Sequence, residues 1–191
     1  MAGRARQHDS EERIVAAALA LFDQRGFGQV TMEEIAAAAD VSRRTVYRKF
    51  ATKGHVVLAV PQRWLKAWDD AVTALPRARP IEAAEAGCLA VARYIDEHRS
   101  EVLTAYAALA ESPTLESAGT SNVQWIARVV ALLDREPQPV ASSVQHVIAG
   151  AYLGAIDAMM LQWVSSGGAG SVLAETEAVV ERLRPIWPAS A

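Results

Sequence analysis

A cluster of basic side chains between Ser42 and Lys53 is the part of the sequence whose residue types and spacing best support chemistry. It holds five Lys or Arg residues and no acidic residue, although the whole chain carries a net charge of −3. Guanidinium and ammonium groups bind phosphate, and arginine also pairs with guanine through two hydrogen bonds. These residues therefore favour nucleic-acid binding rather than catalysis.

The spacing of this cluster fits a short helix with two different faces. Side chains at i, i+1, i+4 and i+5 share one face, and here they are Arg43, Arg44, Tyr47 and Arg48. Val46 and Phe50, four residues apart, share another face and are expected to anchor the helix to its neighbours. Ser42 is a good N-cap for it. We expect the arginines to reach base edges, and Thr45, Tyr47 and Lys49 to contact phosphates.

Two helices are expected to precede this basic helix and to position it. The first starts at Asp9 or Ser10 after a mobile arm of residues 1–8, and it ends at Gly26. Its apolar residues follow the spacing of one buried face, namely Ile14, Ala17, Ala18, Leu21 and Phe22. The pattern predicts one amphipathic helix.

The second helix begins with a capping box formed by Thr31 and Glu34, in which each side chain binds the other residue's N–H group. A tight break follows at Asp40, which tolerates the left-handed backbone better than most residues. Two short helices joined by such a turn, the second of them basic, predict a helix-turn-helix that enters the DNA major groove. Lys53 adds a cation at the start of the next helix, where N–H groups favour phosphate.

The stretch from Ile14 to Leu58 resembles the DNA-binding domain of the tetracycline-repressor (TetR) family. The motifs that carry this resemblance are Ala20-Leu21-Phe22, Gly26-Phe27, Thr31-Met32-Glu33-Glu34-Ile35-Ala36, the run from Val41 to Phe50, and Lys53. The sequence departs from the family pattern at Asp40, where glycine is usual, and at Ala51, Gly54 and His55.

This resemblance implies an all-α protein of about nine helices. The helix-turn-helix and its N-terminal arm would occupy residues 1–52, and residues 53–191 would form a helical ligand-binding and dimerisation domain. It implies a repressor that binds a palindromic double-stranded DNA operator as a homodimer and is released by a small-molecule effector. The DNA-contacting residues that it implies are Thr31, Ser42, Arg43, Arg44, Thr45, Tyr47, Lys49 and Lys53.

The remainder of the chain also has a helical pattern. A fourth helix is expected to start at Thr52 and to kink at Pro61, because proline there lacks the N–H that would bond to the Val57 carbonyl. Residues 76–80 are expected to form a linker. Further helices are predicted at about 81–98, 101–111, 115–134, 140–164 and 171–184.

Aromatic and sulfur-containing side chains in this second part could line an apolar cavity for a small lipophilic effector. They are Trp64, Trp68, Tyr94, Tyr106, Trp125, Met159 and Trp163. Ordinary core packing is the alternative for each of them. The segment from Glu111 to Leu115, followed by Trp125 and Trp163, is similar to family members that sense acyl-CoA-like or other lipophilic ligands.

Small residues four apart near the C-terminus allow helices to approach closely, which is suitable for a dimer interface. The predicted interface residues are Gly150, Ala151, Gly154, Ala155 and Ala158 on one helix, and Val172, Val179 and Leu183 on the next. The alternative is that these helices only close the core of one chain.

Several other classes of protein and site are disfavoured by the sequence. Cys88 is the only cysteine, so no intrachain disulfide is possible, and the polar N-terminus lacks the apolar core of a signal peptide. The apolar run from Val140 to Val164 is interrupted by polar residues, so no membrane association is expected. We expect a cytoplasmic protein with no cofactor, no metal site and no catalytic residues.

Two alternatives to a ligand-responsive repressor stay open at this point. An architectural DNA-binding protein without an effector would use the same basic helix with no sequence preference. An enzyme acting on a lipophilic substrate is the other, although no nucleophile, base and orienting group can be paired from the sequence.

Overall fold

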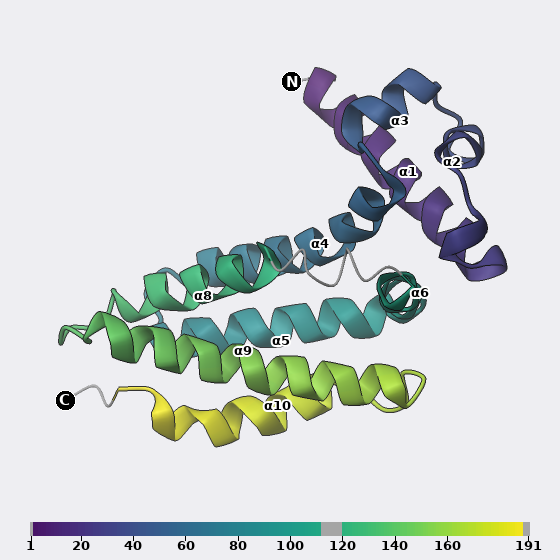
Figure 1. Cartoon of the computed structure of the whole chain (residues 1–191). Helices are drawn as coiled ribbons and strands as arrows, with labels where there is room; N and C mark the ends of the chain where they lie inside the picture. The colour runs from purple at the N-terminus through teal and green to yellow at the C-terminus, as the bar shows by residue number, and fades with distance from the viewer. Residues whose placement is uncertain (1, 112–119, 189–191) are drawn as a thin grey trace. The chain divides into compact units, whose positions relative to one another are not determined.

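The protein is described by a computed structural model that covers residues 2–111 and 120–188 (Figure 1). Within these residues the chain forms nine α-helices and two short 3₁₀ helices, and no strand, which confirms the predicted all-α class. In chain order they are α1 (Ala2–Arg25), η1 (Phe27–Gln29), α2 (Met32–Ala38), α3 (Arg43–Lys49), α4 (Lys53–Ala74), α5 (Pro80–Glu97), α6 (Arg99–Ala110), α8 (Thr120–Leu133), α9 (Ser142–Ser165), α10 (Val172–Leu183) and η2 (Arg184–Ile186).

The helices form two compact units. The first contains residues 2–62 and 100–111, and the second contains residues 63–99 and 120–188. Helix α4 therefore begins in the first unit and ends in the second, and it continues as a helix through Pro61. Helix α6 belongs to the first unit although it follows α5 in the chain. The division after residue 52, which the family resemblance implies, stays a prediction.

Helix α1 is longer than the sequence analysis expected, because it begins at Ala2 and not at Asp9 or Ser10. The prediction of a separate arm over residues 1–8 was wrong. Alanine, arginine and glutamine dominate this segment and favour helix, and no proline interrupts it. The predicted end was confirmed, since Gly26 leaves the helix with φ 81°, a conformation that glycine adopts without strain.

In the second unit, α5 packs against both α8 and α10, and α9 packs against the same two helices. Gly87 on α5 allows the closest approach, because a Cβ atom there would lie 2.5 Å from the ring of Trp68 on α4. The Trp68 ring in turn meets the Trp125 ring edge to face, with centroids 5.4 Å apart. Large aromatic rings therefore fill much of this core.

The turn between α9 and α10 is held to α5 by an ionic pair. Asp96 accepts hydrogen bonds from the N–H groups of Val172 and Leu173 at 3.0 Å each, at the first turn of α10. Arg99 binds Asp96 at 3.1 Å and donates to the carbonyls of Gly168 and Gly170. Together the two side chains fix the direction in which α10 leaves the turn.

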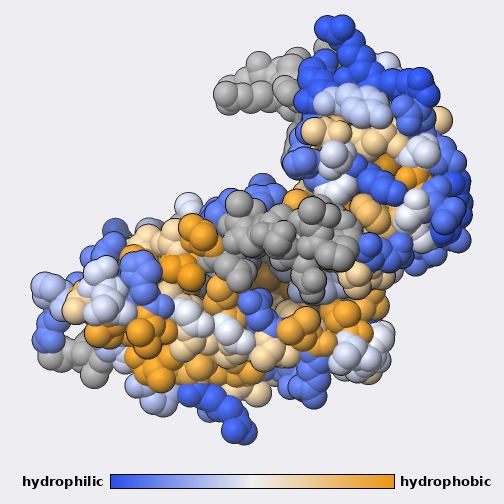
Figure 2. Space-filling model, viewed as in Figure 1, coloured by the Kyte–Doolittle hydropathy of each residue, from blue (hydrophilic) through white to orange (hydrophobic). Residues whose placement is uncertain are grey.

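One face of α9 is apolar and open to solvent. The helix is long and apolar enough to cross a membrane by length and composition alone, with a mean hydropathy of 1.4 and 28% of the segment buried. Figure 2 shows hydrophobic residues along the part of the second unit where α9 runs. The exposed apolar residues of α9 are Val144, Val147, Gly150, Ala151, Gly154, Ala158 and Leu161. They follow one side of the helix, and exposed Asp157 interrupts them between Gly154 and Leu161.

Candidate nucleic-acid interface

The start of α2 is fixed by the predicted capping box. The Thr31 N–H donates to the Glu34 carboxylate at 2.8 Å, and the Glu34 N–H donates to the Thr31 hydroxyl at 3.3 Å. Arg25, the last residue of α1, adds an ion pair to Glu34 at 2.8 Å. Hydrogen bonds from the Thr31 N–H, the Arg25 side chain and the Thr31 hydroxyl lower the pKa of Glu34 to about 2. The carboxylate therefore ties the end of α1 to the beginning of α2.

The turn between α2 and α3 has the left-handed backbone that the sequence predicted. Asp40 has φ 51°. Among the described residues it is the only one other than glycine with a positive φ. The Val41 N–H donates to the Ala36 carbonyl at 3.1 Å and closes the turn. An aspartate therefore takes the place that glycine usually has in the family, and the tight turn still forms.

Helix α3 is capped and anchored as predicted. The Ser42 hydroxyl accepts a hydrogen bond from the Thr45 N–H at 3.1 Å and lies 2.8 Å from the Thr45 hydroxyl. Val46 is fully buried and Phe50 is 6% exposed. These two side chains hold the helix against its own unit, so the opposite face is left to solvent.

That solvent face carries the predicted base-reading residues. Arg43, Arg44, Tyr47 and Arg48 are all exposed. The side chain of Arg43 is 71% exposed, and Tyr47 is 48% exposed, which is unusual for so large a ring. Three guanidinium groups and a phenol thus share one short, convex helix face.

The sequence analysis missed Glu33 as part of this surface. The Tyr47 hydroxyl donates to its carboxylate at 3.2 Å, and an Arg43 nitrogen lies 3.6 Å from the same oxygen. Partial desolvation and this carboxylate raise the pKa of Tyr47 above its ordinary value. Glu33 was visible in the sequence only as part of a family motif, since its register relative to α3 depends on the turn between the helices.

The two lysines of the predicted set face inward. The Lys49 side chain is only 6% exposed and lies 3.3 Å from the carboxylate of Glu11 on α1. The Lys53 ammonium donates to the carbonyls of Phe27, Gly28 and Val30 at 2.5, 3.2 and 3.1 Å, and it lies 4.4 Å above the Phe27 ring. Both lysines therefore make contacts within the unit. From the sequence, their charge and spacing fit a phosphate contact equally well.

Comparison with known proteins agrees with this geometry. Residues 14–60 match the model of the family described as bacterial regulatory proteins, tetR family. The match covers the second half of α1, all of α2 and α3, and the start of α4. This part of the chain is a TetR-family domain.

Two regulators of this kind are similar to the chain in sequence. The HTH-type transcriptional regulator EthR of Mycolicibacterium smegmatis is 29% identical over 67% of this chain and 61% of its own length, so the chain spans less than two thirds of that relative. The HTH-type transcriptional repressor KstR of Rhodococcus jostii is 27% identical over 77% of this chain and 71% of its own length. These relatives are transcription regulators rather than enzymes.

Solved structures of TetR-family repressors share the fold of nearly the whole chain. FadR of Thermus thermophilus, in complex with lauroyl-CoA, aligns with a TM-score of 0.66 at 21% identity, over 95% of this chain and 96% of its own. SmeT, the repressor of a multidrug efflux pump of Stenotrophomonas maltophilia, was solved in complex with triclosan. That complex aligns with a TM-score of 0.69 at 17% identity, over 92% of this chain and 90% of its own.

The predicted effector residues are divided between the two units. Tyr106 belongs to the first unit, and the other six belong to the second. Trp68 and Trp125 pack on each other, and Tyr94 stacks on His98 with centroids 4.0 Å apart. Trp64 is partly buried.

Met159 and Trp163 line a small cavity of about 190 Å³ beside the α9–α10 turn. Of the segment predicted to resemble lipid-sensing family members, residues 112–115 lie outside the described residues. The lining of a larger effector site in this part of the chain therefore stays a prediction.

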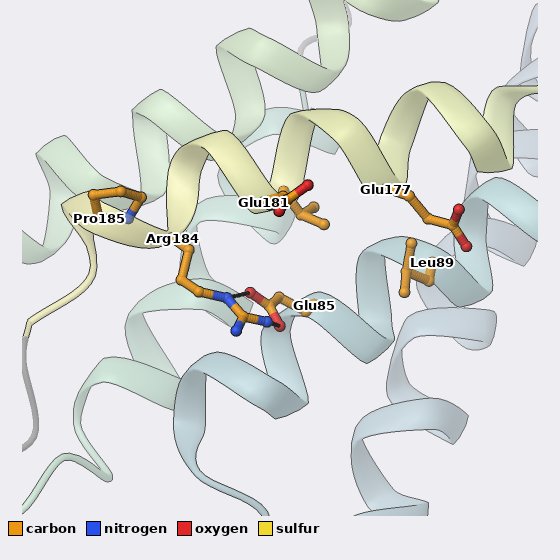
Figure 3. Close-up of a pocket in the computed structure, with 7 residues that line it drawn as sticks. Glu85, Leu89, Glu177, Glu181, Arg184 and Pro185 are labelled. Carbon is orange, nitrogen blue, oxygen red and sulfur yellow. Dashed lines mark hydrogen bonds and ion pairs between the residues drawn. The ribbon is translucent and has the colours of Figure 1, made fainter.

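A groove of about 580 Å³ lies between α5 and α10. Figure 3 shows Glu177 and Glu181 beside it, and Arg184 pairing with both oxygens of Glu85. The two hydrogen bonds are 2.8 and 2.6 Å long, so Arg184 and Glu85 satisfy each other. None of the predicted effector residues lines this groove. No group of three or more potential metal ligands was found among the residues that the structure describes.

The predicted dimer residues divide by exposure. Gly150, Ala151, Gly154 and Ala158 are exposed on α9, and an added Cβ at either glycine would meet nothing within 4 Å. Ala155, Val179 and Leu183 are half-buried. Val172 is 1% exposed and is buried within its own chain. The exposed part of the set thus lies on α9.

Proposed function

We propose that this TetR-family chain is a cytoplasmic transcriptional repressor that binds an operator in double-stranded DNA through α3. The observation that carries the proposal is the exposed face of α3, where Arg43, Arg44 and Arg48 stand opposite the buried Val46 and Phe50. A short basic helix held in this way fits the DNA major groove, and its arginines suit paired hydrogen bonds to guanine. Phosphate binding then rests mainly on the exposed arginines and Tyr47, because Lys49 and Lys53 are engaged within the unit.

The proposed repressor acts as a homodimer on a palindromic operator. The exposed apolar stripe of α9 supports this step, because small residues allow two helices to pack closely and exclude water from both stripes. A dimer that reads two half-sites on one face of DNA must hold its two α3 helices about 34 Å apart, which is one turn of the double helix.

The proposed effector is a small lipophilic molecule. Two similar structures were solved in complex with lauroyl-CoA, whose acyl chain is apolar, and with triclosan, which is largely apolar. The body of this chain is rich in tryptophan side chains that can line an apolar site. Effector binding would shift the position of α3 in the dimer, and by linkage operator DNA would weaken effector binding by the same factor.

In vitro selection of bound DNA from a random pool tests the DNA-binding proposal. We expect a two-fold symmetric consensus whose binding weakens steeply as salt concentration rises, because phosphate contacts release counterions. The double variant Arg43→Ala with Arg44→Ala is expected to weaken operator binding at least about 30-fold, since each lost base contact is worth about 1–3 kcal/mol. Arg77→Ala, which changes an exposed arginine outside α3, is the matched control. Enrichment without symmetry or preference would instead support an architectural DNA-binding protein.

A further inference from the structure

Glu33 is an acidic residue placed within the basic surface that we assign to DNA. Among the twelve residues from Ser42 to Lys53 none is acidic, so the negative charge on this surface comes from the neighbouring helix α2. One carboxylate oxygen of Glu33 serves both Tyr47, at 3.2 Å, and Arg43, at 3.6 Å. The side chain of Glu33 is 38% exposed, so the carboxylate stays in contact with solvent.

A carboxylate at this place opposes binding of the phosphate backbone. Two unit charges about 6 Å apart in water repel each other enough to lower affinity about threefold. That penalty applies to DNA of any sequence, because phosphates are the same in every duplex. An acidic residue here is therefore unfavourable for affinity alone.

The same carboxylate restrains two side chains that contact DNA in our proposal. An arginine with a free side chain samples many rotamers and loses that freedom when it binds a base. Glu33 holds the Arg43 guanidinium and the Tyr47 hydroxyl near one point before DNA arrives. This arrangement favours contacts of defined geometry, such as paired hydrogen bonds to a base, over loose contacts to phosphate.

We propose that Glu33 is a specificity-determining residue, which positions Arg43 and Tyr47 for the operator and lowers the affinity for DNA of other sequences. The inference rests on the proposed DNA-binding function and concerns how the protein prefers its operator over other DNA. Specificity is a difference between two affinities, so a residue that weakens the wrong complex more than the right one increases it. Glu33 acts through Arg43 and Tyr47 and is a positioning residue.

Two substitutions separate the charge of Glu33 from its hydrogen bond. Glu33→Gln removes the charge and keeps an oxygen that accepts from Tyr47, whereas Glu33→Ala removes both. The probes are a random-sequence duplex and the operator selected by the unmodified protein, measured at several salt concentrations. Glu97→Gln, at the exposed end of α5, makes the same change of charge away from α3 and is the control.

Both Glu33 variants are expected to bind the random duplex about threefold more tightly than the unmodified protein. The ratio of operator affinity to random-duplex affinity is expected to fall for Glu33→Gln and to fall further for Glu33→Ala, with no change for Glu97→Gln. Absorbance titration of tyrosine provides a second measurement, since Glu33→Gln should lower the pKa of Tyr47 toward its ordinary value. That titration checks that the Glu33 carboxylate contacts Tyr47 in solution, whereas a merely structural role for Glu33 would leave the affinity ratio unchanged.

Three outcomes would overturn the inference. An unchanged ratio in both variants shows that Glu33 does not determine specificity. A changed preference at one base pair, with no gain on the random duplex, means that Glu33 itself contacts a base. If the unmodified protein selects no preferred sequence, the proposed function fails first and the inference fails with it, which is seen before any variant is measured.

Discussion

The two units expose surfaces of opposite chemistry. In the first, α3 presents arginines and a tyrosine to water, whereas in the second, α9 presents mainly valine, leucine, alanine and glycine, with Asp157 among them. A charged surface is stable in water and gains from phosphate, so its binding depends strongly on salt. An apolar stripe gains from being covered by another apolar surface, and salt affects this little. The same chain thus carries one surface suited to DNA and one suited to a second copy of itself.

Each unit also contains a charged side chain that binds main-chain atoms and holds neighbouring elements together. In the first unit the Lys53 ammonium donates hydrogen bonds to three carbonyl oxygens around η1, just before α2. In the second unit, Asp96 accepts hydrogen bonds from two N–H groups at the start of α10. The sign of each charge matches the polarity of the backbone groups it binds, a cation for carbonyls and an anion for N–H groups. The following predictions test this pairing of an exposed surface with an internal ionic contact.

The largest effect is expected from placing a charge on the apolar stripe. Gly154→Glu should leave each chain folded, because an added Cβ at Gly154 meets nothing within 4 Å. Burying the new carboxylate against a second α9 without a partner should weaken dimerisation at least about 100-fold. Analytical ultracentrifugation across a range of concentrations measures this change.

The control for that experiment is Ala127→Glu, which places the same side chain at an exposed position of α8. It should leave the dimer unchanged. A Gly154→Glu protein that dimerises as well as the unmodified chain would show that the stripe on α9 is not the interface. The exposed apolar face of α9 would then have to contact something other than a second copy of the chain.

A smaller effect is expected from Lys53→Met, which removes the cation from η1. Losing charged hydrogen bonds to these carbonyls, two of which are part-buried, should lower the free energy of unfolding by about 2 kcal/mol. Urea denaturation followed by circular dichroism measures it, and Lys66→Met, in an exposed pair with Asp70 on α4, should change stability by less than about 0.5 kcal/mol. Unchanged stability, with a slope of log affinity against log salt reduced by about 0.9, would instead make Lys53 the phosphate contact predicted from sequence.

The sequence predicted best those features that depend on near neighbours. The capping box at Thr31, the cap at Ser42 and the left-handed turn at Asp40 are each decided within a few residues, and all were confirmed. The buried anchors Val46 and Phe50 follow from helical periodicity.

The features that sequence reasoning missed depend on packing between helices. The direction of the Lys53 ammonium and the role of Glu33 require the relative positions of α2, α3 and α4, which no local pattern contains. The predicted start of α1 was wrong. Asp9 and Ser10 can cap a helix, but the residues before them also favour helix, so the helix continues through both. Aromatic residues in the body could not be divided between core and cavity, since both uses have the same helical spacing.

The smallest effect is expected from Asp96→Asn, and it should depend on pH. Partial burial raises the pKa of Asp96, but the N–H groups of Leu173 and Val172, the Ser171 hydroxyl and Arg99 outweigh it and hold the pKa below the ordinary value. A lowered pKa in the folded state means that the ionised carboxylate stabilises the fold above the unfolded pKa, and that this stability is lost as the pH falls through the folded pKa. At pH 7 the substitution should therefore lower the free energy of unfolding by about 1 kcal/mol, the usual effect of losing a helix cap.

In acid the two proteins should converge, because protonated Asp96 has no more charge than asparagine. Asp70→Asn, which breaks only an exposed pair on α4, should stay close to the unmodified protein at every pH. Urea midpoints measured at several values from pH 7 down to pH 2 distinguish the two. A difference for Asp96→Asn that is the same at every pH would mean that hydrogen-bond geometry, and not charge, holds α10 to α5. The parallel between Asp96 and Lys53 would then fail, since only the contact in the first unit would be ionic in its energetics.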